Sequence, residues 1–249
     1  MKFLGVIPAR YASTRFPGKP LALINGKPMI ERVYTRAMKA TCLETVIVAT
    51  DDERILRAVI AFGGKCMMTL PDHTNGTERC AEIASRMKTE GHPADVIINI
   101  QGDEPYIHPE QIDQLSTCFA DASTEIATLV RRIQKLEDIQ DPNIIKVVFD
   151  QHLYALYFSR SPIPCSRNAE MKTWMEKTAY FKHIGMYAYR SSVLEELVKM
   201  EVSSLEKAES LEQLRWMENG KKIRLAITEE DSYSVDIPDD LRKFINMSW

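Results

Sequence analysis

The sequence predicts an α/β fold built on a mixed, mostly parallel sheet with an added antiparallel portion. Apolar strand-like runs alternate with helical patterns over residues 1–100, as a parallel sheet with crossover helices requires. Between about residues 126 and 190, strand-like runs follow one another with little helix between them, which indicates antiparallel pairing or an added arm. The first part is therefore typical of a Rossmann-like fold.

Each element of the first part is predicted from a local signal. Short apolar runs predict buried strands, apolar residues at helical spacing predict helices, and Gly63 with Gly64 ends one of them. A capping box of Thr50 and Glu53 is expected to open the second helix. The expected strands span residues 3–7, 45–49, 65–68 and 96–100, and the expected helices span residues 29–40, 52–62 and a stretch that ends near residue 88.

The second part is predicted from strand-like runs and two further capping signatures. Ser192 with Glu195, and Ser203 with Glu206, are expected to open helices, and Pro238 fits the first turn of a terminal helix. The long loop at residues 161–178 is a candidate lid or interface arm. The expected strands span residues 126–131, 145–149, 154–158, 181–189 and 223–227. We expect residues 1–249 to form one domain, with the arm inside residues 126–190.

The composition argues against several classes of protein. A net charge of −3 over 249 residues gives no overall attraction to nucleic acid or to an anionic membrane. No apolar run approaches the roughly 20 residues that span a bilayer, and the chain starts directly in a strand without a leader. Five well-separated cysteines without a CxxC pair favour reduced thiols. We therefore expect a soluble, cytoplasmic protein with neither nucleic-acid nor membrane partners.

The loop after the first strand concentrates positive charge. Arg10, Arg15 and Lys19 follow the strand directly, and prolines with Gly18 stiffen and turn the backbone that carries them. Asp103 follows the strand at residues 96–100, and the carboxyl ends of parallel strands share one edge of a sheet. Cations that can bind anionic groups would then lie beside an acid that can bind a hard metal. Taken alone, a basic loop such as the one after the first strand is more often a solvated surface loop.

Two further polar segments complete the candidate site. Residues 72–79 combine hydrogen-bonding side chains with a glycine before a helix, which suits recognition of a base or a sugar. Asp236 would pair with Asp103 as a ligand of Mg²⁺, which proteins hold with one or two carboxylates plus phosphates and water. The alternatives are that Asp236 caps the last helix and that His183 and Tyr187 belong to the core.

Familiar catalytic motifs are missing from the sequence. There is no GxGxxG after the first strand and no GxxxxGK[ST], so neither a dinucleotide oxidoreductase nor a P-loop phosphotransferase is favoured. A GxSxG elbow and an HExxH motif are missing as well. Any phosphate binding would therefore depend on charged side chains more than on a glycine cradle.

Short motifs extend through nearly the whole chain in a characteristic order. They are IPARYASTRFPGKPL from Ile7, NGKPMI from Asn25, IVATD from Ile47, GTER from Gly76, QGDEP from Gln101, YALYFSR from Tyr154, LEQLR from Leu211 and VD from Val235. With these motifs the sequence resembles the 3-deoxy-manno-octulosonate cytidylyltransferases, also called CMP-Kdo synthetases. Cys165, Ala188 and Ile237 depart from the usual pattern, but none of these departures removes a charged group.

The resemblance implies a Rossmann-like nucleotidyltransferase fold and a homodimer formed through the antiparallel arm. It implies transfer of CMP from CTP to 3-deoxy-D-manno-octulosonate (Kdo), with release of pyrophosphate, Mg²⁺ as cofactor and lipopolysaccharide biosynthesis as the setting. Sialic-acid cytidylyltransferases carry a loop closer to PARGGSKG, so sialic acid is the weaker acceptor. The alternatives are a catalytically silent sensor on the same scaffold and an enzyme that acts on another sugar acid or a sugar phosphate.

The resemblance also implies roles for individual residues. Arg10, Lys19 and Asp103 match catalytic positions, and Asp103 with Asp236 matches the metal ligands. The nucleotide-binding positions are Pro8, Ala9, Arg10, Arg15, Lys19, Asn75, Gly76 and Gln101, of which the last three are expected to read cytosine. The positions expected around the sugar acid are Arg79, Arg160, His183, Tyr187, Glu212 and Gln213. Either Arg79 or Arg160 is expected to bind the Kdo carboxylate, because a guanidinium fork binds a carboxylate bidentately.

Overall fold

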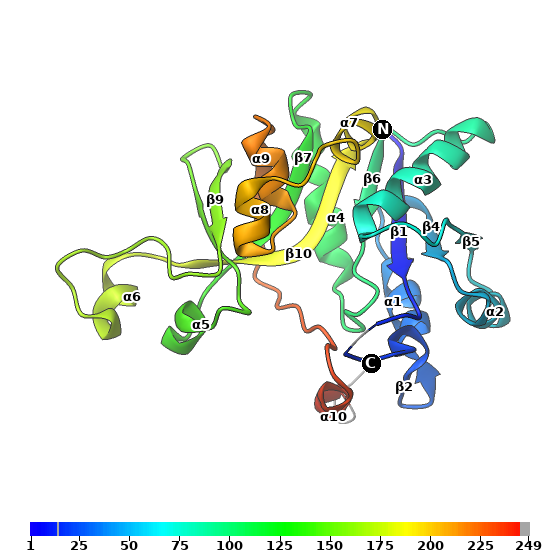
Figure 1. Cartoon of the computed structure of the whole chain (residues 1–249), viewed down its shortest axis with the longest axis horizontal. Coiled ribbons are helices and arrows are strands. Elements are labelled where there is room, and N and C mark those ends of the chain that lie inside the picture. The colour runs from blue at the N-terminus through cyan, green and yellow to red at the C-terminus, as the bar shows by residue number, and fades with distance from the viewer. Residues whose placement is uncertain (14, 245–249) are drawn as a thin grey trace.

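The centre of the computed structural model, which describes residues 1–13 and 15–244, is a nine-stranded mixed sheet (Figure 1). Its strands are β1 (Phe3–Ala9), β4 (Leu43–Thr50), β5 (Cys66–Met68), β6 (Val96–Asn99), β7 (Ile126–Arg132), β8 (Lys146–Phe149), β9 (Ala155–Ser159), β10 (Phe181–Arg190) and β11 (Ile223–Ile227). The order across the sheet is β11-β7-β10-β6-β1-β4-β5, with β8 beside β10 and β9 beside β8. Only β9 and β10 run against the other seven strands, so the predicted mixed, mostly parallel sheet is confirmed.

Helices cover both faces of this sheet. They are α1 (Met29–Ala37), α2 (Glu53–Ala61), α3 (Gly76–Thr89), α4 (Pro109–Thr117), α5 (Leu136–Gln140), α6 (Trp174–Lys177), α7 (Ser191–Leu197), α8 (Ser204–Glu209), α9 (Gln213–Glu218) and α10 (Leu241–Phe244), with 3₁₀-helices η1 (Lys19–Leu21), η2 (Cys118–Ala120), η3 (Met171–Thr173) and η4 (Pro238–Asp240). Ile7 of β1 packs in one core with α1, α2 and α4, and its neighbour Val6 packs in the other with α3, α7 and α9. The two cores arise because successive side chains of a strand point to opposite faces. Within the described ranges, no helix has the length and apolarity needed to cross a lipid bilayer.

The alternation predicted for residues 1–100 is confirmed, with strand and helix ends shifted by a few residues. The predicted cap of α2 is wrong, because the carboxylate of Asp52 accepts the hydrogen bond from the Arg54 N–H at 2.8 Å. Thr50 is the last residue of β4, and its hydroxyl accepts instead from the N–H of Asp52 at 3.2 Å. The helix therefore starts two residues later than the Thr50 box would require.

The strands predicted for the second part are also confirmed, but only one of its two capping boxes is present. Ser203 and Glu206 form a capping box at α8. The box predicted at Ser192 is wrong, because α7 begins directly after Arg190 with no side-chain cap. Helices α4, α5, α6 and α9 were not predicted. α5, α6 and α9 have 5, 4 and 6 residues, and packing decides whether such short helices form more than periodicity does, whereas α4 is as long as the predicted α1 and α2.

An arm extends from one end of the sheet and contains β8, β9, α5 and α6 (Figure 1). β7 and β10 lie within the same stretch of sequence but are strands of the central sheet. Within β10, β8 pairs with Phe181 and Lys182 at the start of the strand. On its other side, β8 pairs with β9. The predicted loop at residues 161–178 contains two helical turns, η3 and α6. Trp174 of α6 stacks on Tyr180 within the arm.

The C-terminal segment returns to the beginning of the chain. As predicted, the terminal helical segment begins at Pro238, and η4 continues into α10. Val235 and Phe244 pack with Ile24 beside the small hairpin of β2 (Leu23–Ile24) and β3 (Lys27–Pro28). This packing holds the segment around Val235 against the loop that follows β1.

We expect Asp52→Ala to lower the free energy of unfolding by about 1 kcal/mol, because α2 loses the side chain that caps its first turn. Glu53→Ala removes an exposed side chain of the box that the sequence predicts, and it is expected to cost less than about 0.5 kcal/mol. Urea unfolding of the two variants measures both costs. An equal or larger cost for Glu53→Ala would contradict the cap seen in the structure.

Candidate active site

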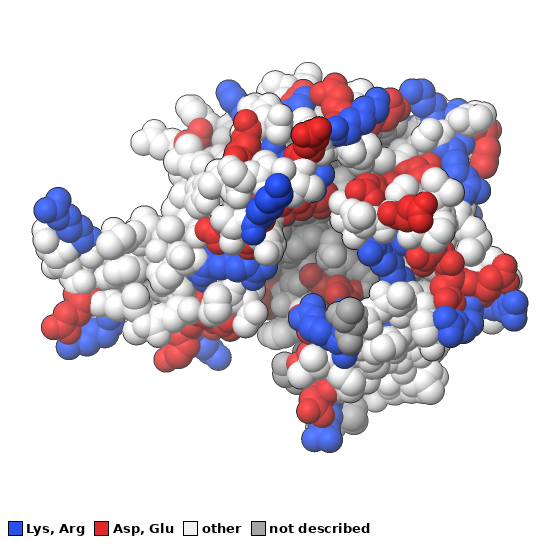
Figure 2. Space-filling view, viewed as in Figure 1, with Lys and Arg blue, Asp and Glu red and all other residues white. Residues whose placement is uncertain are grey.

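The loops that follow β1 and β6 meet at the carboxyl edge of the parallel strands. β1 pairs in parallel with both β4 and β6, so the ends of all three strands lie together. A cavity of about 390 Å³ opens between these loops, and the predicted residues in its wall are Pro8, Ala9, Arg10, Arg15, Lys19, Gln101 and Asp103. Figure 2 shows that this face of the molecule is hollowed between the arm and the first loop, with basic and acidic side chains on both sides.

Two glycines allow the loops to approach each other closely. A Cβ on Gly102 would lie 2.7 Å from the carbonyl oxygen of Pro8, which no side chain can tolerate. A Cβ on Gly76 would lie 3.2 Å from the ring of Pro8. The first loop, the loop after β6 and the start of α3 therefore form one continuous wall.

Lys19 joins three segments that are far apart in the sequence. Its Nζ lies 2.6 Å from Asp103 Oδ2 and donates to the carbonyl of Val235 at 2.8 Å. The N–H of Val235 in turn donates to the carbonyl of Asp103 at 2.9 Å. Both charged side chains are largely buried, with 15% and 28% of their surface exposed, so water screens this ion pair less than it would a surface pair.

Asp236 faces the first loop and not the last helix. Its Oδ1 lies 2.8 Å from the guanidinium of Arg15, in a pair that is open to solvent. The carboxylate that accepts hydrogen bonds at the start of η4 belongs to Asp240, which binds the N–H groups of Asp236 and Ile237. The alternative in which Asp236 caps the last helix is therefore wrong.

This network joins the segments that carry the two predicted metal ligands. Asp103 is bound to Lys19, Lys19 is bound to Val235, and Asp236 is the next residue. Within residues 1–13 and 15–244, no group of three or more His, Cys, Asp or Glu side chains could hold a metal. Two carboxylates fit Mg²⁺ if a substrate supplies the other oxygens.

Arg10 and Arg79 differ in their freedom to bind a ligand. Burial, then the charge of Arg79, lowers the pKa of Arg10, while Asp51 and Glu78 act in the opposite direction. Arg79 is completely buried, and its guanidinium donates to Asp51 at 2.8 Å and to Thr69 at 2.5 Å. Arg10 therefore offers its charge to the cavity, whereas Arg79 is occupied by protein partners.

Asn75, one of the residues expected to read cytosine, uses its side chain to cap helix α3. Its side-chain oxygen accepts from the N–H of Glu78 at 2.9 Å and caps α3. Gly76 lies against Pro8 at the cavity wall, and Gln101 lines the cavity. Which of them contacts a base stays a prediction.

A second cavity of about 290 Å³ lies on the other side of the loop after β6. Glu104 lines it together with His183, Gly185, Ser232 and Ser234. His183 Nε2 lies 2.9 Å from the hydroxyl of Thr128, and burial lowers its pKa to about 3, so the imidazole is neutral. Glu104 was not among the predicted site residues, although a charged residue between Asp103 and a proline after a buried strand was a signal.

Three more residues expected around the sugar are Tyr187 on β10 and Glu212 and Gln213 at the start of α9. Tyr187 is buried, and its hydroxyl has no hydrogen-bond partner among the described residues. The Thr77 hydroxyl donates to Glu212 at 2.8 Å. Burial raises the pKa of Glu212 to about 7, against the opposing effects of Thr77 and Arg215. Gln213 is buried at the first position of α9.

Arg160 is held by backbone oxygens and stays partly exposed. Its guanidinium donates to the carbonyls of Glu209 at 2.7 Å and of Pro142 at 2.9 Å. The backbone N–H of Arg160 donates to the Glu209 carboxylate at 2.9 Å. Among the described residues, the guanidinium of Arg160 donates only to backbone carbonyls, whereas that of Arg79 donates to the Asp51 carboxylate.

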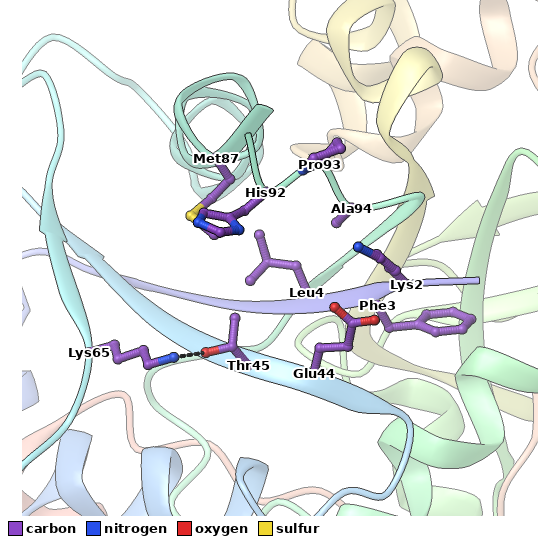
Figure 3. Close-up of a pocket in the computed structure, with 10 residues that line it drawn as sticks. All are labelled: Lys2, Phe3, Leu4, Glu44, Thr45, Lys65, Met87, His92, Pro93 and Ala94. Carbon is purple, nitrogen blue, oxygen red and sulfur yellow. Dashed lines mark hydrogen bonds between the residues drawn. The ribbon is translucent and has the colours of Figure 1, made fainter. Parts of the chain in front are cut away.

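A further cavity lies at the opposite, amino-terminal edge of the sheet (Figure 3). Leu4, Thr45 and His92 line it, and Lys65 donates to Thr45 at 2.8 Å. It encloses about 250 Å³ and contains none of the predicted site residues. Because ligands of open parallel sheets bind at the carboxyl ends of the strands, we place the active site at the other edge.

Comparison with known proteins identifies relatives over the full chain. A family model described as cytidylyltransferase matches residues 4–223. The chain is 53% identical to the 3-deoxy-manno-octulosonate cytidylyltransferase of Parabacteroides distasonis, over 98% of this chain and 96% of that one. It is 52% identical to the protein of the same name from Bacteroides thetaiotaomicron, over 97% and 96%. A solved CMP:2-keto-3-deoxy-manno-octonic acid synthetase in complex with CTP is 45% identical, with a TM-score of 0.89, over 98% and 96% of the two chains.

The stability of the protein should fall between about pH 4.5 and pH 7 because of Glu212. Its pKa is about 7 in the fold and 4.5 in the reference state, so the folded chain binds more protons than the unfolded chain in this window. We expect Glu212→Gln to reduce the fall by about 3 kcal/mol, as measured by urea unfolding at pH 4.5 and pH 7.5. Glu110→Gln, at an exposed position of α4, is the control, and an unchanged pH dependence in Glu212→Gln would contradict the burial argument.

Proposed function

This chain belongs to the 3-deoxy-manno-octulosonate cytidylyltransferase family, and from that premise we propose that it transfers CMP from CTP to Kdo and releases pyrophosphate. The observation that carries the proposal is the convergence of Arg10 and Lys19 with Asp103 and Asp236 at one sheet edge. A triphosphate needs cations, and its bound metal needs carboxylates. The cavity between these loops brings both together.

The proposed reaction is an in-line displacement at phosphorus. The anomeric hydroxyl of Kdo attacks the α-phosphorus of CTP, the bond from that phosphorus to the β-phosphate oxygen breaks, and the hydroxyl releases its proton. Catalysis of this kind consists mainly of positioning the two reactants and neutralising developing charge. Arg10 and Lys19 would bind the triphosphate oxygens, with Arg15 assisting from the rim.

The ion pairs that Lys19 and Arg15 form support an exchange of partners when CTP binds. Lys19 is paired with Asp103 and Arg15 with Asp236. A triphosphate would take over both cations, and the two carboxylates would then be released to bind Mg²⁺. When bound there, Mg²⁺ would neutralise phosphate charge and bring the attacking hydroxyl closer to ionisation.

We place the acceptor sugar on the side of the second cavity. His183 lines that cavity and is neutral, so it can exchange hydrogen bonds with hydroxyl groups without adding charge. Of the two arginines expected near the Kdo carboxylate, we favour Arg160, because Arg79 is completely buried and already paired with Asp51. Moving Arg79 to a ligand would leave that carboxylate without its partner.

We further propose that two chains associate through the arm. Leu156 on β9 is 60% exposed, and the arm projects from the sheet (Figure 1). Burying such residues against a second copy would remove apolar surface from water. The five cysteines are free thiols, which favours a reducing cytoplasm, and CMP-Kdo made there would serve lipopolysaccharide biosynthesis.

The proposed function is tested by measuring pyrophosphate release with each nucleoside triphosphate crossed against Kdo, sialic acid and simple sugar phosphates. We expect CTP with Kdo to exceed every other pair by at least about 100-fold in kcat/KM. No activity with CTP and Kdo would reject the proposal. Preference for another acceptor would leave a cytidylyltransferase with a different sugar specificity.

We expect Asp103→Ala to lower kcat by about 100-fold or more at ordinary Mg²⁺, because one metal ligand and the partner of Lys19 are lost together. The measurement is pyrophosphate release over a Mg²⁺ titration. Asp239→Ala removes an exposed carboxylate three residues after Asp236 and is the control. Near-normal turnover of Asp103→Ala would refute the assignment.

A further inference from the structure

Glu104 is a buried acid that the proposed nucleotide chemistry does not use. Only 5% of its surface is exposed. Its carboxyl oxygen Oε2 is buried and has no hydrogen-bond partner among the described residues. A buried carboxyl with unused hydrogen-bonding capacity costs free energy, which calls for an explanation.

The backbone places Glu104 and its neighbour Asp103 on different sides of one loop. Gln101, Gly102 and Asp103 line the nucleotide cavity, whereas Glu104 lines the second cavity. The close approach of Gly102 to Pro8 pins this loop on one side, and the backbone bond from Val235 to Asp103 pins it on the other. The loop is therefore a rigid partition with a carboxyl facing each cavity.

The opposite wall of the second cavity leaves space for a ligand beside Glu104. Gly185 belongs to β10, at an irregularity in its pairing with β7 between Ile184 and Tyr187. A Cβ on Gly185 would lie 3.7 Å from Glu104 Oε1. No side chain at position 185 fills this space, so the carboxyl is within reach of a molecule in the cavity.

The wall of the second cavity contains a basic group as well as the carboxyl of Glu104. Lys182 lines it, and its Nζ lies 2.6 Å from Asp231. Arg131 also pairs with Asp231, at 2.7 Å, so two cations share one carboxylate. Asn143, Ser232 and Ser234 add hydrogen-bonding groups that match a polyhydroxylated ligand.

We propose that Glu104 determines acceptor specificity, by exchanging a hydrogen bond with a hydroxyl group of the sugar acid in the second cavity. This inference rests on the proposed function and adds to it a residue that reads the acceptor. A site built to hydrogen-bond a hydroxyl rejects an analogue that lacks it, because the buried partner is left unpaired. Asp103 would thus act on the nucleotide side of the partition and Glu104 on the acceptor side.

The first test compares Glu104 variants in steady-state kinetics, with Kdo and CTP each varied while the other is saturating. We expect Glu104→Ala to raise KM for Kdo at least about 10-fold while KM for CTP changes less than about twofold. Glu104→Gln keeps both a donor and an acceptor, so its KM for Kdo should stay within about threefold of the original. Glu110→Ala, at an exposed position of α4, is the matched control.

The second test uses Kdo analogues that each lack one hydroxyl group. The original protein should discriminate against several of them, and Glu104→Ala should lose that discrimination at a single position, which a merely structural role would not produce. Gly185→Ala keeps Glu104 but adds a methyl group beside it, and it should also raise KM for Kdo. This variant tests the same contact if Glu104→Ala does not fold.

The outcomes separate this inference from the proposed function. If the original protein turns over CTP and Kdo but Glu104→Ala and Gly185→Ala keep a normal KM for Kdo, the role of Glu104 is rejected and the reaction stands. A loss in Glu104→Gln as large as that in Glu104→Ala would also reject the hydrogen bond. Absence of turnover in the original protein would reject the proposed function itself.

Discussion

The ion pair between Lys19 and Asp103 is the interaction on which the site depends. It joins the loop after β1 to the loop after β6, and the bond from Lys19 to the carbonyl of Val235 adds the C-terminal segment. Each of these segments comes from a different part of the chain, so the loss of chain entropy on bringing them together must be offset by contacts of this kind. The sheet holds the ends of β1 and β6 side by side, and the contacts of Lys19 hold together the loops that follow these strands.

Close backbone approach is the second constraint on the site. Gly102 must lie against Pro8 for Asp103 to reach Lys19, and a larger residue there would push the two loops apart. The same contact turns Glu104 toward the second cavity. The loop that contains Gly102 therefore lies between the nucleotide side and the acceptor side of the proposed site. Its position depends on the lack of a side chain at Gly102.

Local signals predicted the strands well and the helix starts less well. β1, β4 and β6 are buried apolar runs, and burial on both faces leaves such runs few other conformations. The capping box at Ser203 is present, whereas those expected at Thr50 and Ser192 are not. A hydroxyl three residues before a glutamate caps a helix only if the chain leaves the preceding strand in the right direction, and tertiary packing decides that direction.

The order of amino acids was enough to predict the α/β class, the charged loops at the strand ends and, through the order of its motifs, the family. Adjacency in parallel strands was enough to expect Asp103 beside the cations of the first loop. Three features became visible only in the folded chain: Arg79 is paired with Asp51, Asp236 is paired with Arg15, and Glu104 lines a different cavity from Asp103. Burial and pairing of a charged side chain depend on residues distant in sequence, and no local pattern encodes them.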